Sequence, residues 1–100
     1  MREDLFKNAL DLSSGGKFNL ALQEWNQYLE SYPDDAAGFS NRGNVRLVVG
    51  DVKGSIDDQN KAIGLNPSEI DPYINRGIAE EALGLWSQAK KDYMFVISQD

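Results

Sequence analysis

A chain of 100 residues, 41% of them hydrophobic, has the length and composition of one ordinary domain with a buried core. Its formal net charge of −6 comes from 16 acidic and 10 basic residues, with no Lys/Arg cluster, so nucleic acid and anionic membranes are not expected as partners. The absence of cysteine and histidine excludes disulfides, Cys/His zinc sites, thiol nucleophiles and Ser/His/Asp triads.

The first third of the chain is predicted to form two helices joined at Gly15-Gly16. A glycine pair also occurs in phosphate-binding loops, but no strand is expected before this pair and no Gly-Lys-Ser/Thr follows it. The glycines are therefore interpreted as a turn between two helices.

In the middle third, Asp35 is expected to cap a helix that runs to about Val49, where Gly50 supplies the left-handed conformation that ends it. A second helix is predicted from about Val52 to the turn at Asn66-Pro67. The last third follows the same plan: Asp71 is expected as an N-cap before Pro72, and Gly84 is expected to end that helix.

One interval of 34 residues relates residues of several kinds along the chain. The related pairs include Gly43 and Gly77, Gly50 and Gly84, Phe39 and Tyr73, and Ile63 and Ile97. One interval earlier, Ala9 corresponds to Gly43, Gly16 to Gly50 and Pro33 to Pro67. This interval predicts three units within a single domain, at about residues 2–34, 35–68 and 69–100.

Small residues recur where the two helices of each unit must approach closely. They are Ala9, Gly43 and Gly77 in the first helices, and Ala21, Ser55 and Ala89 in the second helices. Larger side chains are expected to form three apolar layers, the third of which is interrupted by Gln59. The layers are Leu5, Phe39 and Tyr73; Phe18, Val52 and Trp86; and Trp25 and Tyr93. A single hairpin cannot bury these faces, so the units are expected to stack.

This order of aromatic, small, small, aromatic and proline residues in a 34-residue unit resembles three tandem tetratricopeptide repeats. The resemblance covers residues 2–100 and implies an all-α fold, a right-handed superhelical solenoid of three helix-turn-helix hairpins with six helices. It also implies a scaffold for protein–protein interaction, and the composition makes that scaffold acidic and soluble. The chain departs from the family pattern at Asn8, Arg42 and Arg76, where leucine is usual, and at Gln59.

Two of these departures suggest ion pairs. Arg42 precedes Asp58 by sixteen residues and Arg76 precedes Asp92 by the same distance, whereas Asn8 replaces the arginine in the first unit. Because the charged partners recur together, each arginine is predicted to bridge the two helices of its own unit. The alternative is that the arginines bind an anionic ligand.

In this family the first helices line a concave groove, and the resemblance implies that function resides there. The groove candidates are Phe6, Leu10, Asn41, Asn44, Val48, Asn75 and Ile78, with Ser13 and Ala82 beside them. Asparagine amides can pair with the backbone of an extended peptide, and the apolar side chains can contact its side chains. Alternatively, Asn41 and Asn75 only support the scaffold, and further repeats or a terminal helix cover the apolar positions.

The charge of the groove bears on the partner. Some domains of this family bind the acidic C-termini of heat-shock chaperones through a two-carboxylate clamp of lysine, asparagine and arginine. The corresponding positions here are Phe6, Leu10, Asn41, Asp71 and Asn75, of which only Asn41 agrees. Because Asp71 would repel a carboxylate and Glu3 and Glu81 are expected nearby, the partner is expected to be a protein or peptide that is apolar with some basic character.

The last helix carries Met94, Phe95, Val96 and Ile97 in succession, and no capping helix follows. Uncapped solenoid ends expose apolar surface that tends to associate. The sequence is therefore expected to be a fragment of a longer repeat protein. The alternative function is structural assembly or self-association through a face that includes Met94, Phe95 and Ile97.

Catalysis is not expected. Adjacent carboxylates such as Asp57-Asp58 point about 100° apart on a helix, and no nucleophile or metal-ligand set accompanies them. Accordingly, neither a cofactor nor a metal site is expected. The short apolar runs and the absence of an apolar N-terminal stretch favour a soluble intracellular protein, in the cytoplasm. A plastid is the weaker alternative, because the Asn-Arg-Gly repeats resemble those of many plastid proteins.

Overall fold

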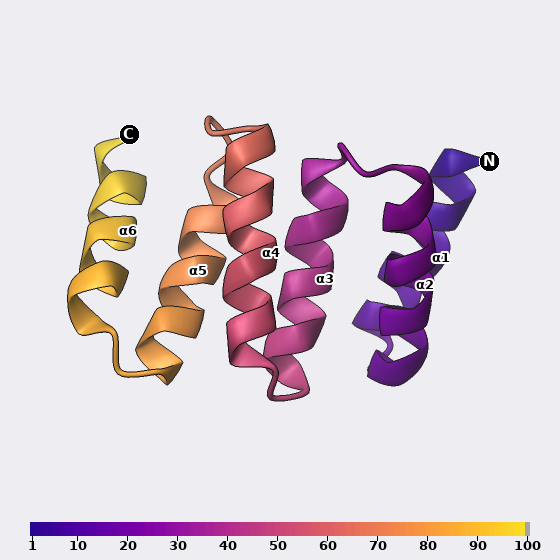
Figure 1. Ribbon diagram of the computed structural model, residues 1–100, viewed down its shortest axis with the longest axis horizontal. Helices are drawn as coiled ribbons and strands as arrows, with labels where there is room; N and C mark the ends of the chain where they lie inside the picture. Colours follow the sequence, from indigo (N-terminus) through magenta and orange to yellow (C-terminus); the bar gives the residue numbers. More distant parts are fainter. Residues whose placement is uncertain (100) are drawn as a thin grey trace.

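The computed structural model describes residues 1–99 and consists of six α-helices joined by short loops (Figure 1). The helices are α1 (Arg2–Ser14), α2 (Phe18–Ser31), α3 (Ala36–Val48), α4 (Val52–Leu65), α5 (Asp71–Ala82) and α6 (Trp86–Ser98). No strand occurs among residues 1–99, so the expected all-α class with six helices is confirmed. The last residue of the expected third unit, Asp100, lies outside the described residues.

A left-handed glycine follows the first helix of each hairpin. Gly16, Gly50 and Gly84 have φ angles of +78°, +93° and +75°, which side chains with a Cβ atom disfavour. The residue after each glycine donates its backbone N–H to a carbonyl near the end of the preceding helix, at 2.8–2.9 Å. The predicted glycine turns are therefore confirmed in all three hairpins.

Aspartates begin both helices of the middle hairpin, because the side chains of Asp35 and Asp51 accept hydrogen bonds of 3.1 and 3.0 Å from backbone N–H groups in the first turn. The expected N-cap role of Asp71 is wrong. Ile70 is the N-cap of α5, Asp71 is its first residue and Pro72 lies in its first turn. The helix starts early because Ile70 already has helical backbone angles, φ −83° and ψ −40°.

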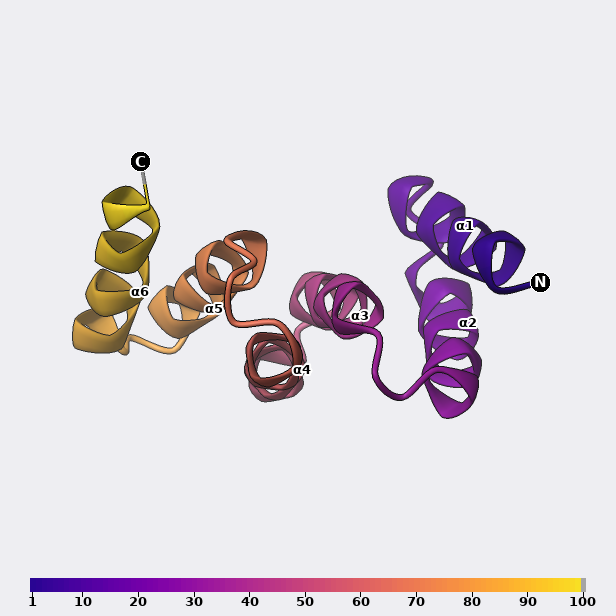
Figure 2. The ribbon, with the colours of Figure 1, turned by 90° about the horizontal axis from the view of Figure 1, so that it is seen from above.

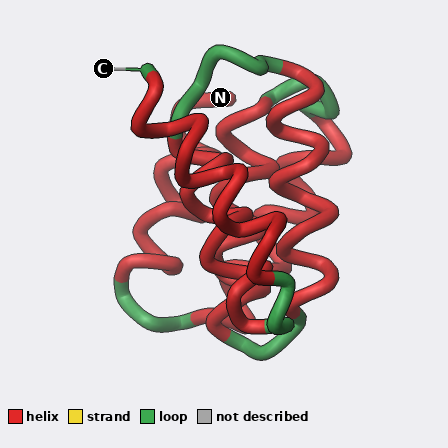
Figure 3. Tube along the Cα trace, turned by 90° about the vertical axis from the view of Figure 1, so that its left-hand side faces the viewer, coloured by secondary structure: helices red, strands yellow, loops and turns green. Residues whose placement is uncertain are grey.

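The six helices pack in chain order, and α3 also contacts α1 and α5. Seen from above, they follow an arc in which α2 and α4 lie on the outer side and α1, α3 and α5 face the inner side (Figure 2). The loops lie at the two ends of the helices (Figure 3). The expected solenoid of stacked hairpins is thus present, and its concave face is formed by the first helices.

Aromatic rings fill the core of the first hairpin. Phe6, Trp25 and Tyr28 pack edge to face, with ring centroids 5.1–5.8 Å apart. Ala9 and Ala21 are fully buried beside these rings and allow α1 and α2 to approach. Phe6 is only partly buried, and its ring packs against this core.

Glycines allow the helices of the other two hairpins to approach. A Cβ atom on Gly43 would lie 2.6 Å from Gln59 Nε2, and one on Gly77 would lie 2.5 Å from the ring of Tyr93. Real Cβ atoms do not make contacts this short. The prediction that small residues mark close helix contacts is confirmed at both positions.

A polar pair replaces the aromatic pair in the middle hairpin. The hydroxyl of Ser40 donates to Gln59 Oε1 at 2.8 Å, and Gln59 Nε2 donates to the backbone carbonyl of Ser40 at 3.0 Å. By the 34-residue interval, these residues correspond to Phe6 and Trp25 of the first hairpin. Gln59 is fully buried and its amide is hydrogen-bonded to Ser40. Its side chain therefore takes the place of an aromatic ring in the third layer.

Two residues expected in the apolar layers are exposed. Trp86 is 65% exposed and Leu5 is 39% exposed. Trp86 begins α6, and no helix of the described chain lies beyond α6 (Figure 1). Leu5 belongs to α1 at the other end of the array, where one side is likewise not covered by another helix of residues 1–99.

Candidate functional site

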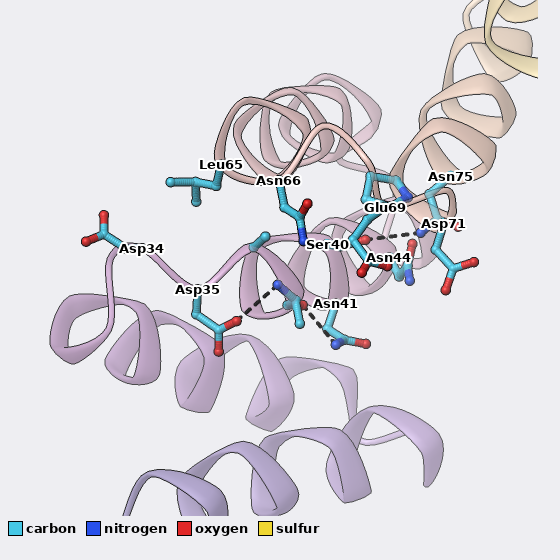
Figure 4. Close-up of a pocket in the computed structure, with 13 residues that line it drawn as sticks. Asp34, Asp35, Ser40, Asn41, Asn44, Leu65, Asn66, Glu69, Asp71 and Asn75 are labelled. Atoms are coloured by element: carbon cyan, nitrogen blue, oxygen red, sulfur yellow. Dashed lines mark hydrogen bonds between the residues drawn. The ribbon is translucent and has the colours of Figure 1, made fainter. Parts of the chain in front are cut away.

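The concave face contains a hollow of about 510 Å³ between α3, the end of α4 and the start of α5 (Figure 4). Its lining is polar, with four asparagines and four carboxylates among thirteen residues. The lining residues are Asp34, Asp35, Ala36, Ala37, Ser40, Asn41, Asn44, Leu65, Asn66, Glu69, Asp71, Pro72 and Asn75.

A second, smaller hollow of about 200 Å³ lies between α1 and α3. It is lined by Leu10, Ser13, Ser14, Phe18, Asn41, Asn44, Val45 and Val48. Because Asn41 and Asn44 line both hollows, the two spaces adjoin along α3 and together form one groove.

Most of the groove candidates from the sequence lie in these hollows. Leu10, Asn41, Asn44, Val48 and Asn75 line one or both of them. The structure does not bring the other two candidates, Phe6 and Ile78, into either lining.

The partly buried ring of Phe6 packs against Trp25 and Tyr28. Ile78 is 45% exposed on α5 but lines neither hollow. Neither residue lines the two hollows, so the role of Phe6 and Ile78 in partner binding stays a prediction.

The asparagine amides are oriented by contacts within the scaffold. Asn41 Nδ2 donates to the carbonyl of Ala37 at 2.9 Å, and Asn75 Nδ2 donates to Ser40 Oγ at 3.2 Å. Asn44 Oδ1 accepts from Gln59 Nε2 at 3.4 Å. Asn41 and Asn75 therefore keep a carbonyl oxygen to accept a hydrogen bond, whereas Asn44 keeps its NH₂ group to donate.

The wider hollow is acidic. Asp34, Glu69 and Asp71 are exposed carboxylates at its rim, and none of its lining residues is lysine or arginine. Asp35 differs because Arg2 lies 3.3 Å away and Tyr28 donates a hydrogen bond to it. Burial alone would raise the pKa of Asp35, but the hydrogen bonds from Tyr28 and Arg2 outweigh burial and lower it.

Both predicted arginine bridges are present outside the groove. Arg42 donates to Asp58 through Nε at 3.0 Å and through Nη2 at 2.8 Å. Arg76 donates to Asp92 in the same way, at 2.8 and 2.6 Å. These contacts confirm the bridging of two helices within each hairpin, and they occupy nitrogens that an anionic ligand would need.

The sequence interpretation missed a third member of each bridge. Arg42 Nη1 donates to Asn26 at 3.0 Å, and Arg76 Nη1 donates to Asn60 at 2.9 Å, so each arginine also reaches the preceding hairpin. The signal was available, because each asparagine stands sixteen residues before its arginine, the same distance that separates arginine from aspartate.

The third hairpin has an unbalanced carboxylate. Arg46 adds a third hydrogen bond to Asp58 at 3.0 Å, but its counterpart in the third hairpin is Glu80. Glu80 Oε2 lies 3.9 Å from Arg76 Nε, and its buried Oε1 has no hydrogen-bond partner among the described residues. Burial, together with the hydrogen bond and charge of Asp92, raises the pKa of Glu80 to about 7.

The three residues of the proposed association face on α6 differ in their exposure. Met94 is 58% and Ile97 70% exposed, whereas the ring of Phe95 stacks on Tyr73 with centroids 4.1 Å apart. Phe95 is thus half-buried within its own hairpin and does not belong to the exposed face. Leu83, Leu85 and Trp86 are exposed near the start of α6, which the sequence interpretation did not include.

Membrane-spanning helices and metal-binding clusters are both absent from residues 1–99. None of the six helices described has both the length and the apolar character needed to cross a bilayer. Within the same residues, no three acidic, histidine or cysteine side chains are grouped in a way that could hold a metal ion.

No protein-family model matches the chain. It is 27% identical over 95 residues to tetratricopeptide repeat protein 36 of Danio rerio, which covers 91% of this chain and 51% of that protein. It is 30% identical over 98 residues to sperm-associated antigen 1 of Homo sapiens, which covers 97% of this chain and 11% of that protein. The chain thus spans about half or less of the length of these curated relatives.

A solved structure of the first tetratricopeptide-repeat domain of Spaghetti (RPAP3), bound to the HSP90 peptide SRMEEVD, is similar in fold. Its TM-score is 0.93 at 26% identity, and the match covers 97% of this chain and 77% of that chain. Together with the six helices and the 34-residue interval, these similarities define the class of protein. The chain belongs to the tetratricopeptide-repeat family and consists of three such repeats.

Proposed function

We propose that the chain is a non-catalytic protein-interaction module that binds an extended peptide segment of its partner in the groove. The observation that carries this proposal is the pair of adjoining hollows along α3, in which Asn41, Asn44 and Asn75 present amide groups. An extended peptide has backbone N–H and C=O groups that need partners, and side-chain amides provide both donors and acceptors.

The partner segment is proposed to be apolar with some basic character. The domain of Spaghetti binds an acidic HSP90 peptide, but two of the corresponding clamp positions here are unsuited to such a ligand. Phe6 has an apolar ring that packs against Trp25 where the clamp has lysine, and Asp71 adds a negative charge at the rim of the wider hollow. Since like charges repel across an interface, these features argue against a carboxylate clamp.

The proposed binding is tested by selecting peptides from a random library on the immobilised chain and measuring their dissociation constants by fluorescence anisotropy. Replacing both Asn41 and Asn75 by alanine should weaken groove-bound peptides about thirtyfold, because two hydrogen bonds of about 1 kcal/mol each are lost. Asn19→Ala is the matched control, since Asn19 is exposed on α2 and lines neither hollow. Equal affinities for the double variant and the control would contradict binding in the groove.

Two further points are part of the proposal. The repeats at about 2–34, 35–68 and 69–100 are proposed to form one domain of a longer protein, which the partial coverage of the relatives supports. The cytoplasm is the proposed compartment, consistent with an acidic chain without cysteine.

A second function, self-association through α6, is favoured by one observation: Trp86, Met94 and Ile97 are all more than half exposed on this terminal helix. Such apolar side chains gathered on one element are typical of a contact surface.

A further inference from the structure

The two ends of the groove differ in charge. The N-terminal ends of α3 and α5 carry the exposed carboxylates Asp34, Glu69 and Asp71, which are labelled around the wider hollow in Figure 4. No positively charged side chain lines the wider hollow, because none of its lining residues is lysine or arginine. This end of the groove is suited to a cation.

Helix dipoles act against this preference but are too weak to cancel it. The N-terminus of a helix is equivalent to about half a positive charge, so α3 and α5 together supply about one. The three exposed carboxylates carry three formal negative charges, and the C-terminal end of α4, where the helix dipole is negative, borders the same hollow. Asp35 does not add to this negative charge, because Arg2 and Tyr28 occupy its carboxylate.

The other end of the groove is apolar. Leu10 from α1, Phe18 from α2, and Val45 and Val48 from α3 line the smaller hollow, and no charged residue lines it. Val48 is 60% exposed, so its side chain is available to a ligand. An apolar side chain placed there would bury surface on both partners.

The length of α3 sets the distance between the two ends. This helix has 13 residues, so at about 1.5 Å per residue it is about 20 Å long. An extended peptide advances about 3.3 Å per residue and covers that distance with about six residues. Asn41 and Asn44 lie between the two ends, where they can pair with the peptide backbone.

We propose that the groove recognises a bipartite segment: an arginine or lysine held by Glu69 and Asp71, and a large apolar residue about six positions away held by Leu10, Phe18 and Val48. This inference rests on the proposed peptide-binding function and adds to it the order and the spacing of the two recognition elements along α3.

The test uses short fluorescein-labelled peptides in a Gly/Ser background and fluorescence anisotropy. The probe has an Arg-Arg pair and a Leu-Phe pair about six residues apart, and it is made in both sequence directions. One comparison peptide has Glu-Glu in place of Arg-Arg, and another has the two pairs adjacent. The better-oriented probe should bind tighter than both comparison peptides, and its affinity should fall as salt increases from about 0.05 M to about 0.3 M.

Variants of the protein separate the two ends. Glu69→Gln with Asp71→Asn should weaken the probe about three- to tenfold and reduce its salt dependence, because exposed charge pairs are lost. Val48→Ser should weaken the probe about threefold or more without changing its salt dependence. Asp57→Asn is the matched control, since Asp57 is exposed on α4 outside both hollows. Circular dichroism confirms that each variant is folded.

The inference is overturned if the Glu-Glu peptide or the adjacent-pair peptide binds as tightly as the probe, or if Glu69→Gln with Asp71→Asn behaves like Asp57→Asn. The library selection distinguishes this failure from a failure of the proposed function. Selected peptides that lack the bipartite pattern, yet are weakened by Asn41→Ala with Asn75→Ala, refute the bipartite motif alone. If neither the library nor the probe yields a groove-dependent peptide, both proposals fail.

Discussion

Arg76 holds the carboxylate of Asp92 with two hydrogen bonds of 2.8 and 2.6 Å, and its remaining terminal nitrogen reaches Asn60 of the preceding hairpin at 2.9 Å. The same guanidinium therefore joins three helices: α4, α5 and α6. Arg42 repeats the arrangement with Asp58 and Asn26, one interval of 34 residues earlier. The bridge thus links neighbouring hairpins as well as the two helices of each hairpin.

Arg76→Lys should destabilise the chain by about 1–3 kcal/mol, because an ammonium group keeps the charge but cannot make the two parallel bonds to Asp92 and the third to Asn60. Urea unfolding followed by circular dichroism measures the change. Asn60→Ala should cost about 1 kcal/mol or less, because it removes a single exposed hydrogen bond. An equal loss in both variants would show that the contact with the preceding hairpin is the dominant one.

The spacing of glycine and proline predicted the hairpins, because the backbone conformation that each of these residues favours depends on the residue itself and its chain neighbours. The bridges to Asp58 and Asp92 could be predicted for another reason, since an arginine and an aspartate sixteen residues apart recur in two units, whereas the first unit has Asn8 in place of the arginine. Asn26 and Asn60 could have been found from the same spacing, but asparagine is common on exposed helix surfaces and indicates no partner by itself.

The groove was less predictable from the sequence. Gln59 was expected to interrupt an apolar layer, but its buried amide pairs with Ser40, nineteen residues away. Phe6 was expected in the groove, and whether it faced the groove or the core depended on the rotation of α1 against α2. Such details arise from packing between helices, which the repeat interval does not determine.

Two glycine substitutions should have opposite effects. Gly43→Ala should destabilise the chain by about 1–3 kcal/mol, because the added Cβ would lie 2.6 Å from Gln59 Nε2 and 3.0 Å from Asp58 Cβ. Gly64→Ala should stabilise it by about 0.5–1 kcal/mol, because nothing lies within 4 Å of the new Cβ and alanine favours the helix. Thermal unfolding measures both changes, and destabilisation by Gly64→Ala would contradict the open space around this position of α4.

Stability should fall as pH rises from about 5 to about 8. The pKa of Glu80 is raised from 4.5 to about 7 in the folded chain, so between these two pH values the folded state keeps a proton that the unfolded chain has released. The contribution is fully present below pH 4.5 and is lost as pH rises through 7, with a size on the order of 1–3 kcal/mol. Melting temperatures at a series of pH values measure it.

Glu80→Gln is the control for this pH dependence. Glutamine resembles the protonated carboxyl group and does not titrate, so the variant should lose most of the slope between pH 5 and 8. Asp35 and Asp92 do not contribute to the slope between pH 5 and 8, because their pKa values are lowered from 3.8. Their contributions to stability are lost only when acid protonates them, below this pH range. A wild-type slope retained in Glu80→Gln would assign the pH dependence to another group.

The exposed side of α6 should cause concentration-dependent association of the chain. Met94 and Ile97 are 58% and 70% exposed, and burying such side chains against another molecule gains about 25 cal/mol for each Å² of apolar area. Multi-angle light scattering should therefore show a mass above that of the monomer at high concentration.

Met94→Gln with Ile97→Ser should restore the monomer, whereas Leu20→Ser, which changes an exposed leucine on α2, should not. Phe95 is left unchanged because its ring supports Tyr73 within the hairpin. A wild-type chain that stays monomeric at every concentration would remove the support for self-association and leave peptide binding in the groove as the proposed function.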